Sequence, residues 1–398
     1  MRALETFSAR FASAAGVDYG VIGHSHGMIS SPDNTSAEAL PRNRDSARLA
    51  GLPLVIEGYT TERAELDVSS GFRRVTTTVV LRGGGCEGRG EDVTYAAEDH
   101  EPYPLDLPLV GTWTLDAYSA FVGGLDLFAA RPPQMEFFRP YRRWAFESAA
   151  LDLALRQQGK TLGAVLERPY RAVRFAVSTR LDITPWLAVD PTLEFKLDPT
   201  PEWDADTVAR IAATGRVRVI DFKSFYEGSP VDNPPDPAQY RMVAAAFPDA
   251  VLEDPVLSGP ARDALDGEEA RFSFDAPIHS WEDVEAVTAR VAAAGGEGCA
   301  GFELRHLNIK PSRFGSLRAL LDCVERAQAA GIALYGGGQF ELGIGRDQIQ
   351  ALASLLYPDG PNDVAPRAYH GEAHAGVPPS PLVPLGEQPP GFGFRFAV

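Results

Sequence analysis

The sequence predicts an α/β protein built largely from parallel strands and crossover helices. From Tyr141 onward, strand-like and helix-like segments alternate, a pattern typical of parallel sheets. Eight strand candidates fall within about 230 residues, which fits a closed (β/α)₈ barrel, although an open doubly wound sheet has the same local pattern. The 398 residues suit two or three domains, and a content of 44% hydrophobic and 23% charged residues is typical of globular chains.

A region of different composition precedes the barrel. The first ~140 residues are rich in glycine, proline and polar residues, and Arg74–Leu81 (RVTTTVVL) is a β-branched, strand-like run. The run leads into Gly83-Gly84-Gly85. A phosphate-binding loop would need a Lys-Ser/Thr pair or a following helix, and GGGCEGRGED has neither. We therefore interpret these glycines as a hairpin turn.

The elements of the barrel region follow in order. An amphipathic helix is expected at Trp144–Arg156, ending before Gly159. The expected strands are Ala172–Val177, Thr192–Leu197, Val217–Ile220, Ala250–Leu252, Phe272–Phe274, Gly301–Ile309, Ile332–Tyr335 and, from a weaker pattern, Ala365–Tyr369. The clearest helices between them are Ala205–Ala213, Trp281–Ala294, Ser316–Ala330 and Arg346–Leu356. The last 25 residues are rich in proline and glycine and predict an irregular tail.

Charge, hydropathy and cysteine content exclude several classes of protein. The net charge is −17 and we find no basic stripe, so nucleic-acid binding is not expected. The apolar runs are shorter than the ~18 residues of a membrane span, and MRALETFSAR lacks the apolar core of a signal peptide. The three cysteines, Cys86, Cys299 and Cys323, are scattered, which argues against disulfides or structural zinc. A cytoplasmic, enzyme-sized protein is expected.

Charged residues stand where the expected strands end, and barrel enzymes place their chemistry there. Three carboxylates on successive strands, Asp221, Glu253 and Asp275, can converge on one hard cation such as Mg²⁺. Lys310 ends the next strand, where a cation would lower the pKa of its amine and make it available as a base. One such residue alone would be a solvated loop residue, but the ordered set favours a site. The same strand ends add Lys196, Asp198 and Lys223.

These residues lie within segments that resemble a known family. The metal candidates stand in VIDFK, VLEDP and FSFDAP, and the lysine stands in LNIKPSRFGS. RRWAFESAALDLALRQQGKTL, GGQFELGIG and RGGGCEGRGED are similar to that family's first barrel helix, seventh-strand segment and capping-domain turn. The sequence is thereby identified as resembling the enolase superfamily, particularly its mandelate racemase and muconate lactonizing branch.

The resemblance implies a modified TIM barrel, (β/α)₇β, with an N-terminal α+β capping domain. The corresponding boundaries are residues 1–140 for the cap, which governs specificity, 141–373 for the barrel, and 374–398 for an irregular segment. It also implies Mg²⁺, a small carboxylate substrate, removal of the proton α to that carboxylate with enediolate stabilisation, and a homo-oligomer. Glu341 and Asn308 are expected to contact the substrate, and His24 in an N-terminal loop either contacts substrate or lies on the surface.

The sequence departs from the family pattern at two strand ends. Where the branch has Lys-x-Lys, Lys196 is followed by Asp198, so a carboxylic acid would oppose the base Lys310. That arrangement favours elimination, in which Asp198 helps a hydroxide leave, although Asp198 can equally cap the loop at Pro199. Where Asp-x-Asn is usual, Lys223 follows Asp221 and is a second base, an anion clamp or a salt-bridge partner.

Three functions remain open at this point. The first is a Mg²⁺-dependent lyase acting by dehydration or β-elimination. The second is a cycloisomerase, racemase or epimerase, in which Lys310 and either Lys196 or Lys223 act on opposite faces of the substrate. The third is a metal-binding barrel without catalysis.

Overall fold

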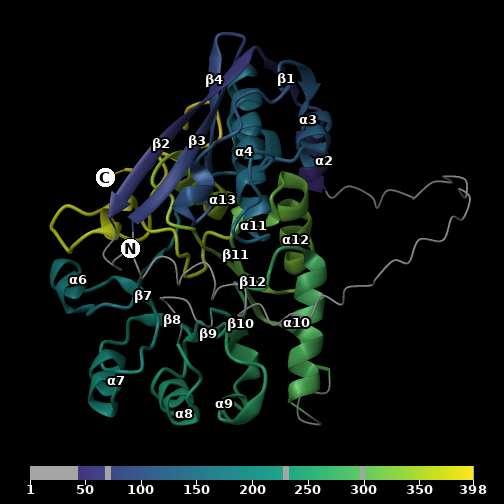
Figure 1. The fold of residues 1–398 in the computed structure, drawn as a ribbon. Helices are drawn as coiled ribbons and strands as arrows, with labels where there is room; N and C mark the ends of the chain where they lie inside the picture. Colours follow the sequence, from purple (N-terminus) through teal and green to yellow (C-terminus); the bar gives the residue numbers. More distant parts are fainter. Residues whose placement is uncertain (1–43, 68–72, 227–232, 296–300, 398) are drawn as a thin grey trace, which may run out of the picture.

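The computed structural model describes residues 44–67, 73–226, 233–295 and 301–397. Figure 1 shows two layers of architecture, with a capping region of long antiparallel strands at the top and a ring of shorter strands and helices below. Helix α4 (Phe138–Gln157) runs through the upper part, and the strands β6 to β12 lie beneath it.

The cap contains two small antiparallel sheets. Strands β2 (Gly58–Asp67), β3 (Arg73–Gly83) and β4 (Cys86–Asp92) form a meander, and β1 (Pro53–Ile56) pairs with β5 (Gly111–Thr114). The turn between β3 and β4 has positive φ at both central residues, Gly84 and Gly85, as a tight hairpin requires. The predicted hairpin is thus confirmed. The remaining cap elements are α2 (Arg44–Ala50), η1 (Ala97–His100) and α3 (Leu115–Gly123).

Two glycines of β4 let the sheet lie directly on α4. A Cβ atom at Gly88 would lie 2.3 Å from the backbone of Ala149, and one at Gly90 would lie 2.1 Å from the backbone of Ala145. Such distances are impossible for real atoms, so only glycine permits this approach. The predicted helix Trp144–Arg156 is confirmed as part of this longer, largely buried α4.

Eight short strands close the barrel. The first seven are β6 (Ala176–Thr179), β7 (Glu194–Leu197), β8 (Val217–Asp221), β9 (Val251–Glu253), β10 (Phe272–Ser273), β11 (His306–Ile309) and β12 (Ala333–Gly336). β6 to β10 form one parallel sheet and β11 pairs with β12. The N–H of Asn308 donates to the carbonyl of Phe274 at 3.2 Å and joins the two sheets. Bridges from Asn362 to Phe175 and from Asp363 to Gly337 close the ring through an eighth, minimal strand.

A helix follows each of the first seven strands, so the chain has the predicted (β/α)₇β order. These helices are α6 (Thr184–Val189), α7 (Ala205–Ala212), α8 (Pro237–Ala246), α9 (Gly259–Asp263), α10 (Trp281–Ala294), α12 (Leu317–Ala329) and α13 (Ile344–Leu356). Shorter pieces are α5 (Leu162–Leu166), α11 (Pro311–Phe314), η2 (Glu269–Arg271) and η4 (Arg367–His370). Asp204, Ser280 and Ser316 cap α7, α10 and α12 with side-chain oxygens, which explains where these helices begin.

The predicted eighth strand, Ala365–Tyr369, is wrong. The strand contacts lie at Asn362 and Asp363, and residues 367–370 form η4. Pro366 has no N–H to extend a ladder, and its carbonyl instead accepts the N–H of Tyr369 at 2.9 Å in a turn. The strands expected at Ala172–Val177 and Gly301–Ile309 begin later than predicted, because pairing starts only at Ala176 and His306, and β6 continues past Val177 to Thr179.

A carboxylate of the cap is bound by the barrel. Glu91 on β4 accepts backbone N–H groups of Leu342 at 2.7 Å, Gly343 at 3.0 Å and Gly345 at 2.8 Å, at the start of α13. A carboxylate at a helix N-terminus is favoured by the helix dipole. These hydrogen bonds therefore attach the cap to the loop that follows the seventh barrel strand.

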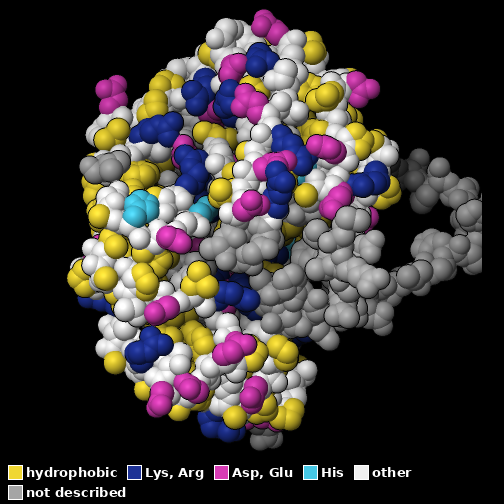
Figure 2. Space-filling view, turned by 60° about the vertical axis from the view of Figure 1, so that its left-hand side comes forward, with side chains coloured by type: hydrophobic (Ala, Val, Ile, Leu, Met, Phe, Trp, Pro, Cys, Tyr) yellow, Lys and Arg dark blue, Asp and Glu magenta, His cyan; other side chains and the backbone are white. Residues whose placement is uncertain are grey.

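The surface mixes charges of both signs. Figure 2 shows lysine and arginine side chains interspersed with aspartate and glutamate over the upper part of this face. On the cap sheet these charges pair across strands, as between Arg82 and Glu87 at 2.8 Å and between Arg89 and Glu62 at 2.8 Å. Among the residues described, no helix is both long and apolar enough to cross a bilayer.

Candidate active site

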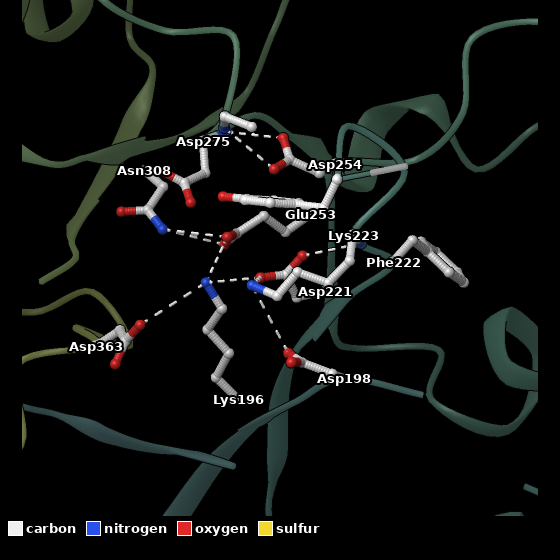
Figure 3. A network of polar contacts seen from close by, with 12 residues as sticks. Lys196, Asp198, Asp221, Phe222, Lys223, Glu253, Asp254, Asp275, Asn308 and Asp363 are labelled. Atoms are coloured by element: carbon white, nitrogen blue, oxygen red, sulfur yellow. Dashed lines mark hydrogen bonds and ion pairs between the residues drawn. The ribbon is translucent and has the colours of Figure 1, made fainter. Parts of the chain in front are cut away.

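The strand ends of the barrel bring the predicted charged residues into one cluster. Lys196 is on β7, Asp221 ends β8, Glu253 ends β9, and Asp275 lies just beyond β10. Figure 3 shows their side chains pointing toward one another, with Lys196 and Lys223 between the carboxylates. Because parallel strands end at the same edge, a regular barrel suffices to gather residues that lie far apart in the sequence.

Several carboxylates of this cluster are placed to hold a cation. Oxygens of Asp221, Glu253 and Asp254 lie within 4.8 Å of one another, and all three residues are buried. The oxygens of Asp254, however, accept the backbone N–H groups of Asp275 at 2.9 Å and Ala276 at 3.1 Å, so this carboxylate also shapes the loop. Both oxygens of Asp275 are buried, and each pairs with a cationic side chain, Lys310 at 2.7 Å and Arg313 at 3.2 Å. Oxygen-rich sites suit hard divalent cations, so the residues present fit such an ion.

Glu253 is the most heavily contacted carboxylate of the cluster. Lys196 and the hydroxyl of Tyr335 donate to it, and the Asn308 amide nitrogen lies 3.2 Å from each of its oxygens. Burial raises the pKa of Glu253 to about 8, against the lowering effect of Lys196. The side chain is therefore held in one place by donors from three strands.

Lys196 lies at the centre of the acids. Its Nζ contacts Glu253, lies 3.1 Å from Asp221 and lies 3.8 Å from Asp363. Burial acts to lower the pKa of Lys196, but the carboxylates around it outweigh that effect and raise the pKa well above its ordinary value. Lys196 thus remains an ammonium that offsets part of the negative charge of these carboxylates.

Lys223 pairs with the same carboxylate oxygen of Asp221 as Lys196 does. Its Nζ contacts Asp221 and lies 3.8 Å from Asp198, whose other oxygen lies 3.4 Å from Arg180. The backbone of Lys223 has φ of 56°, a left-handed conformation that is rare for residues other than glycine. Burial raises the pKa of Asp198, and Lys223 partly opposes this effect. Strain of this kind is concentrated at functional sites.

Lys310 faces Asp275. Its Nζ lies 2.7 Å from one oxygen of Asp275, and Nε of Arg313 lies 3.2 Å from the other. Burial acts to lower the pKa of Lys310, but Asp275 outweighs it and raises the pKa. In this arrangement Lys310 is protonated and acts as a partner of the carboxylate.

Three further predicted site residues are Glu341, His24 and Asn308. Glu341 is buried, but its carboxylate lies 3.1 Å from Arg346 and accepts the N–H of Gln339 at 2.7 Å, so it is turned into the loop after β12. His24 lies outside the described residues. Asn308 lies in the cluster and contacts Glu253 there.

Sequence reasoning missed five of the described members of the cluster: Arg180, Asp254, Arg313, Tyr335 and Asp363. Asp363 was missed because the eighth strand was placed after Ala365. Asp254 and Arg313 stand within the segments VLEDP and LNIKPSRFGS. The sequence therefore placed them near the site but did not indicate which residues they contact. Nothing in the sequence indicated that Tyr335 points at Glu253.

The barrel, its cap and the acidic cluster together define the enolase-superfamily fold, and comparisons with known proteins agree. Muconate lactonizing enzyme from Pseudomonas putida superposes with a TM-score of 0.57 at 18% identity, covering 86% of this chain and 97% of that one. An enolase-superfamily member from Listeria innocua superposes with a TM-score of 0.55 at 18% identity, covering 78% and 86%. In sequence, the N-succinylamino acid racemase of Thermus thermophilus is 28% identical over 331 residues, 77% of this chain and 83% of the other.

A narrower family matches both parts of the chain. Residues 47–165 match the N-terminal domain, and residues 169–371 the C-terminal domain, of the family described as a domain of unknown function (DUF8230). The chain belongs to this family. The predicted resemblance to the enolase superfamily and the predicted fold are confirmed. The relative in sequence is named as a racemase, and one of the structural neighbours is a muconate cycloisomerase.

Proposed function

We propose that this enzyme uses a divalent cation, Mg²⁺, to remove the proton α to the carboxylate of a small organic acid, with Lys310 as the base. The observation that carries the proposal is the placement of Lys310 beside Asp275, at the edge of a cluster of buried carboxylates. The cation, when bound, would offset the negative charge that develops on the substrate carboxylate as the proton leaves.

The charges of the cluster support the cation. Among the described residues, six carboxylates face five cationic side chains, which leaves a formal charge of −1 with every group ionised. With Lys310 as the neutral amine that proton removal requires, the charge is −2, which a divalent cation would balance. The carboxylates are Asp198, Asp221, Glu253, Asp254, Asp275 and Asp363, and the cations are Lys196, Lys223, Lys310, Arg180 and Arg313.

The favoured outcome is β-elimination. Lys310 can act as the base once its amine is neutral, which a cation bound beside Asp275 would favour by offsetting the carboxylate charge. The neutral amine then takes the α-proton, and protonated Asp198 delivers its proton to the leaving hydroxide. Asp198 suits this role because burial raises its pKa and because its Oδ1 is buried without a hydrogen bond. Lys196 and Asn308 hold Glu253 while the proton moves.

A racemase or epimerase is the second candidate, because Lys223 brings an amine to the position next to Asp198. Lys223 and Lys310 pair with different carboxylates, Asp221 and Asp275, so two amines are available in the cluster. Two-base proton transfer would need them on opposite faces of the substrate. The relative named as an N-succinylamino acid racemase favours the same chemistry.

Proton exchange in deuterated water separates these candidates. The purified protein with Mg²⁺ is incubated with hydroxy acids, acid sugars and N-succinylamino acids, and α-deuteration is followed by NMR. Loss of hydroxide with formation of an enol or keto product supports elimination, whereas deuteration with inversion supports isomerisation. Absence of exchange with every acid contradicts the proposal and favours a metal-binding barrel without catalysis.

We further propose a homo-oligomer that acts on small molecules in the cytoplasm, as the resemblance to the superfamily implies. Sedimentation velocity at micromolar concentration tests the assembly. A monomer alone would contradict it.

A further inference from the structure

Three consecutive glycines join β12 to the loop before α13, and each lies against a different neighbour. A Cβ atom at Gly336 would lie 2.7 Å from the ring of Tyr357, and one at Gly338 would lie 2.5 Å from the carboxylate of Glu341. Both neighbours belong to the packing around the barrel and its loop. The middle residue, Gly337, lies against the candidate active site.

Gly337 lies directly beneath the side chain of the proposed base. A Cβ atom there would lie 2.8 Å from Cε and 3.0 Å from Cγ of Lys310, and 2.7 Å from Oδ1 of Asn308. Carbon atoms in contact normally lie roughly 3.5–4.0 Å apart, so a methyl group would displace the lysine chain. The φ of Gly337 is outside the left-handed region, so the backbone conformation itself does not require glycine.

The backbone of Gly337 cannot retreat from this contact. Its N–H donates to the carbonyl of Ile309 at 2.9 Å, and the residue pairs in parallel with Asp363. Gly337 is therefore fixed between β11 and the eighth strand, and the movable partner is Lys310. On its other side, the amine of Lys310 is held 2.7 Å from Asp275.

We propose that Gly337 is a positioning residue for Lys310. Because Gly337 has no side chain, space is left for the alkyl chain of Lys310. The shape of this space determines the position of the Lys310 amine. The packing part of the proposal is independent of the reaction. Its catalytic consequence rests on the proposed function, in which Lys310 removes the α-proton.

A stability cycle tests the packing. We would compare the melting temperatures of the wild type, Gly337→Ala, Lys310→Ala and the double variant, with Gly371→Ala as control because a Cβ there meets nothing within 4 Å. Gly337→Ala should lower the melting temperature or fail to fold. Shortening Lys310 in the same chain should recover a substantial part of the loss, with Asn308 accounting for the remainder. A double variant no more stable than Gly337→Ala would overturn the proposal.

Proton exchange tests the catalytic consequence. Gly337→Ala should lower kcat for α-proton exchange by roughly 100-fold, the effect of misplacing a reacting group by about 1 Å. KM and calorimetric Mg²⁺ affinity should stay close to those of Gly371→Ala, and the loss should persist in an Asn308→Ala background. Exchange at the wild-type rate, or a loss that disappears in that background, would refute the role of Gly337. A wild type without exchange would refute the proposed function and leave the stability cycle valid.

Discussion

The two ends of the barrel hold charged side chains in opposite ways, as one strand, β7, illustrates. At its N-terminal end Glu194 accepts hydrogen bonds from Arg174 at 2.6 and 2.8 Å and from Arg218 at 2.7 Å. Burial acts to raise the pKa of Glu194, but the arginines outweigh it and lower the pKa. Two residues further, Lys196 lies among acids whose mutual repulsion and burial raise the pKa of Glu253 to about 8.

The difference separates stabilising from functional charge. At the N-terminal end each oxygen of Glu194 has an arginine and the side chain is partly exposed, so the ion pairs favour folding. At the C-terminal end several acids lie together fully buried, an arrangement that desolvation penalises. Buried charged residues that destabilise the fold are candidates for a catalytic role. Barrel enzymes place their catalytic residues at the C-terminal ends of the strands.

The largest effect is expected at Lys310. Lys310→Ala should keep Mg²⁺ binding but lose turnover and α-proton exchange by several orders of magnitude, because no other base is placed beside Asp275 in the part of the chain that the structure describes. Lys310→Arg should fail as well, since guanidinium stays protonated. NMR-detected exchange measures both variants. Near-native exchange in Lys310→Ala would move the base to Lys223 or Lys196.

The next effect concerns the three carboxylates predicted as ligands. Replacing Asp221, Glu253 or Asp275 by Ala should severely weaken Mg²⁺ binding while the fold is retained, because each lies at a strand end. Isothermal titration calorimetry measures the affinity, and circular dichroism checks the fold. Near-native affinity in two of these variants would contradict the site and direct attention to Asp254.

A smaller effect is expected from Tyr335. Tyr335→Phe removes the hydroxyl that donates to Glu253 and lies 2.9 Å from Ser273, while the ring stays in place. Groups that orient ligands contribute roughly 10-fold to 100-fold in metal affinity, so we expect a loss at the lower end of this range. Calorimetry against Tyr357→Phe, another buried tyrosine outside the cluster, provides the control. Unchanged affinity would show that Lys196 and Asn308 suffice.

The smallest effect is expected at the opposite end of the barrel. Glu194→Gln should leave turnover unchanged and lower stability by about 1 kcal/mol, since the carboxylate is partly exposed. The folded pKa is below the unfolded value of about 4.3, so the advantage of the wild type is present above that pH. It should shrink as the pH falls through the lower, folded pKa. Urea titrations at several pH values would contradict this if the difference grew in acid.

Strand ends and helices were predictable because they depend on local patterns. The alternation of elements located Asp221, Glu253, Asp275 and Lys310 at or just beyond the ends of four successive strands. The helix Trp281–Ala294 agrees with α10 in both bounds. Resemblance supplied the cap and the (β/α)₇β order, which periodicity alone left open between a barrel and an open sheet. The resemblance was carried by short segments around chemically restricted positions.

Contacts across the barrel could not be read from the sequence. The eighth strand consists of two bridges rather than a ladder, so it has no strand-like pattern and Asp363 was overlooked. Glu341 was assigned to substrate because of its segment, but its orientation depends on Arg346, five residues later on α13. The close contact between Gly337 and Lys310 likewise depends on how their two strand ends pack together. Neither segment of sequence alone predicts it.

The hydrogen bonds between Glu91 and the start of α13 affect the cooperativity of thermal unfolding. Arg74 of the cap, fully buried, also donates to the carbonyl of Gln339 at 2.9 Å in the same loop. Separating cap from barrel would leave a buried carboxylate, a guanidinium and several backbone groups without partners at once. The two parts should therefore unfold in one cooperative transition, with calorimetric and van't Hoff enthalpies in agreement, although the boundary between them looks like a natural place to divide the chain.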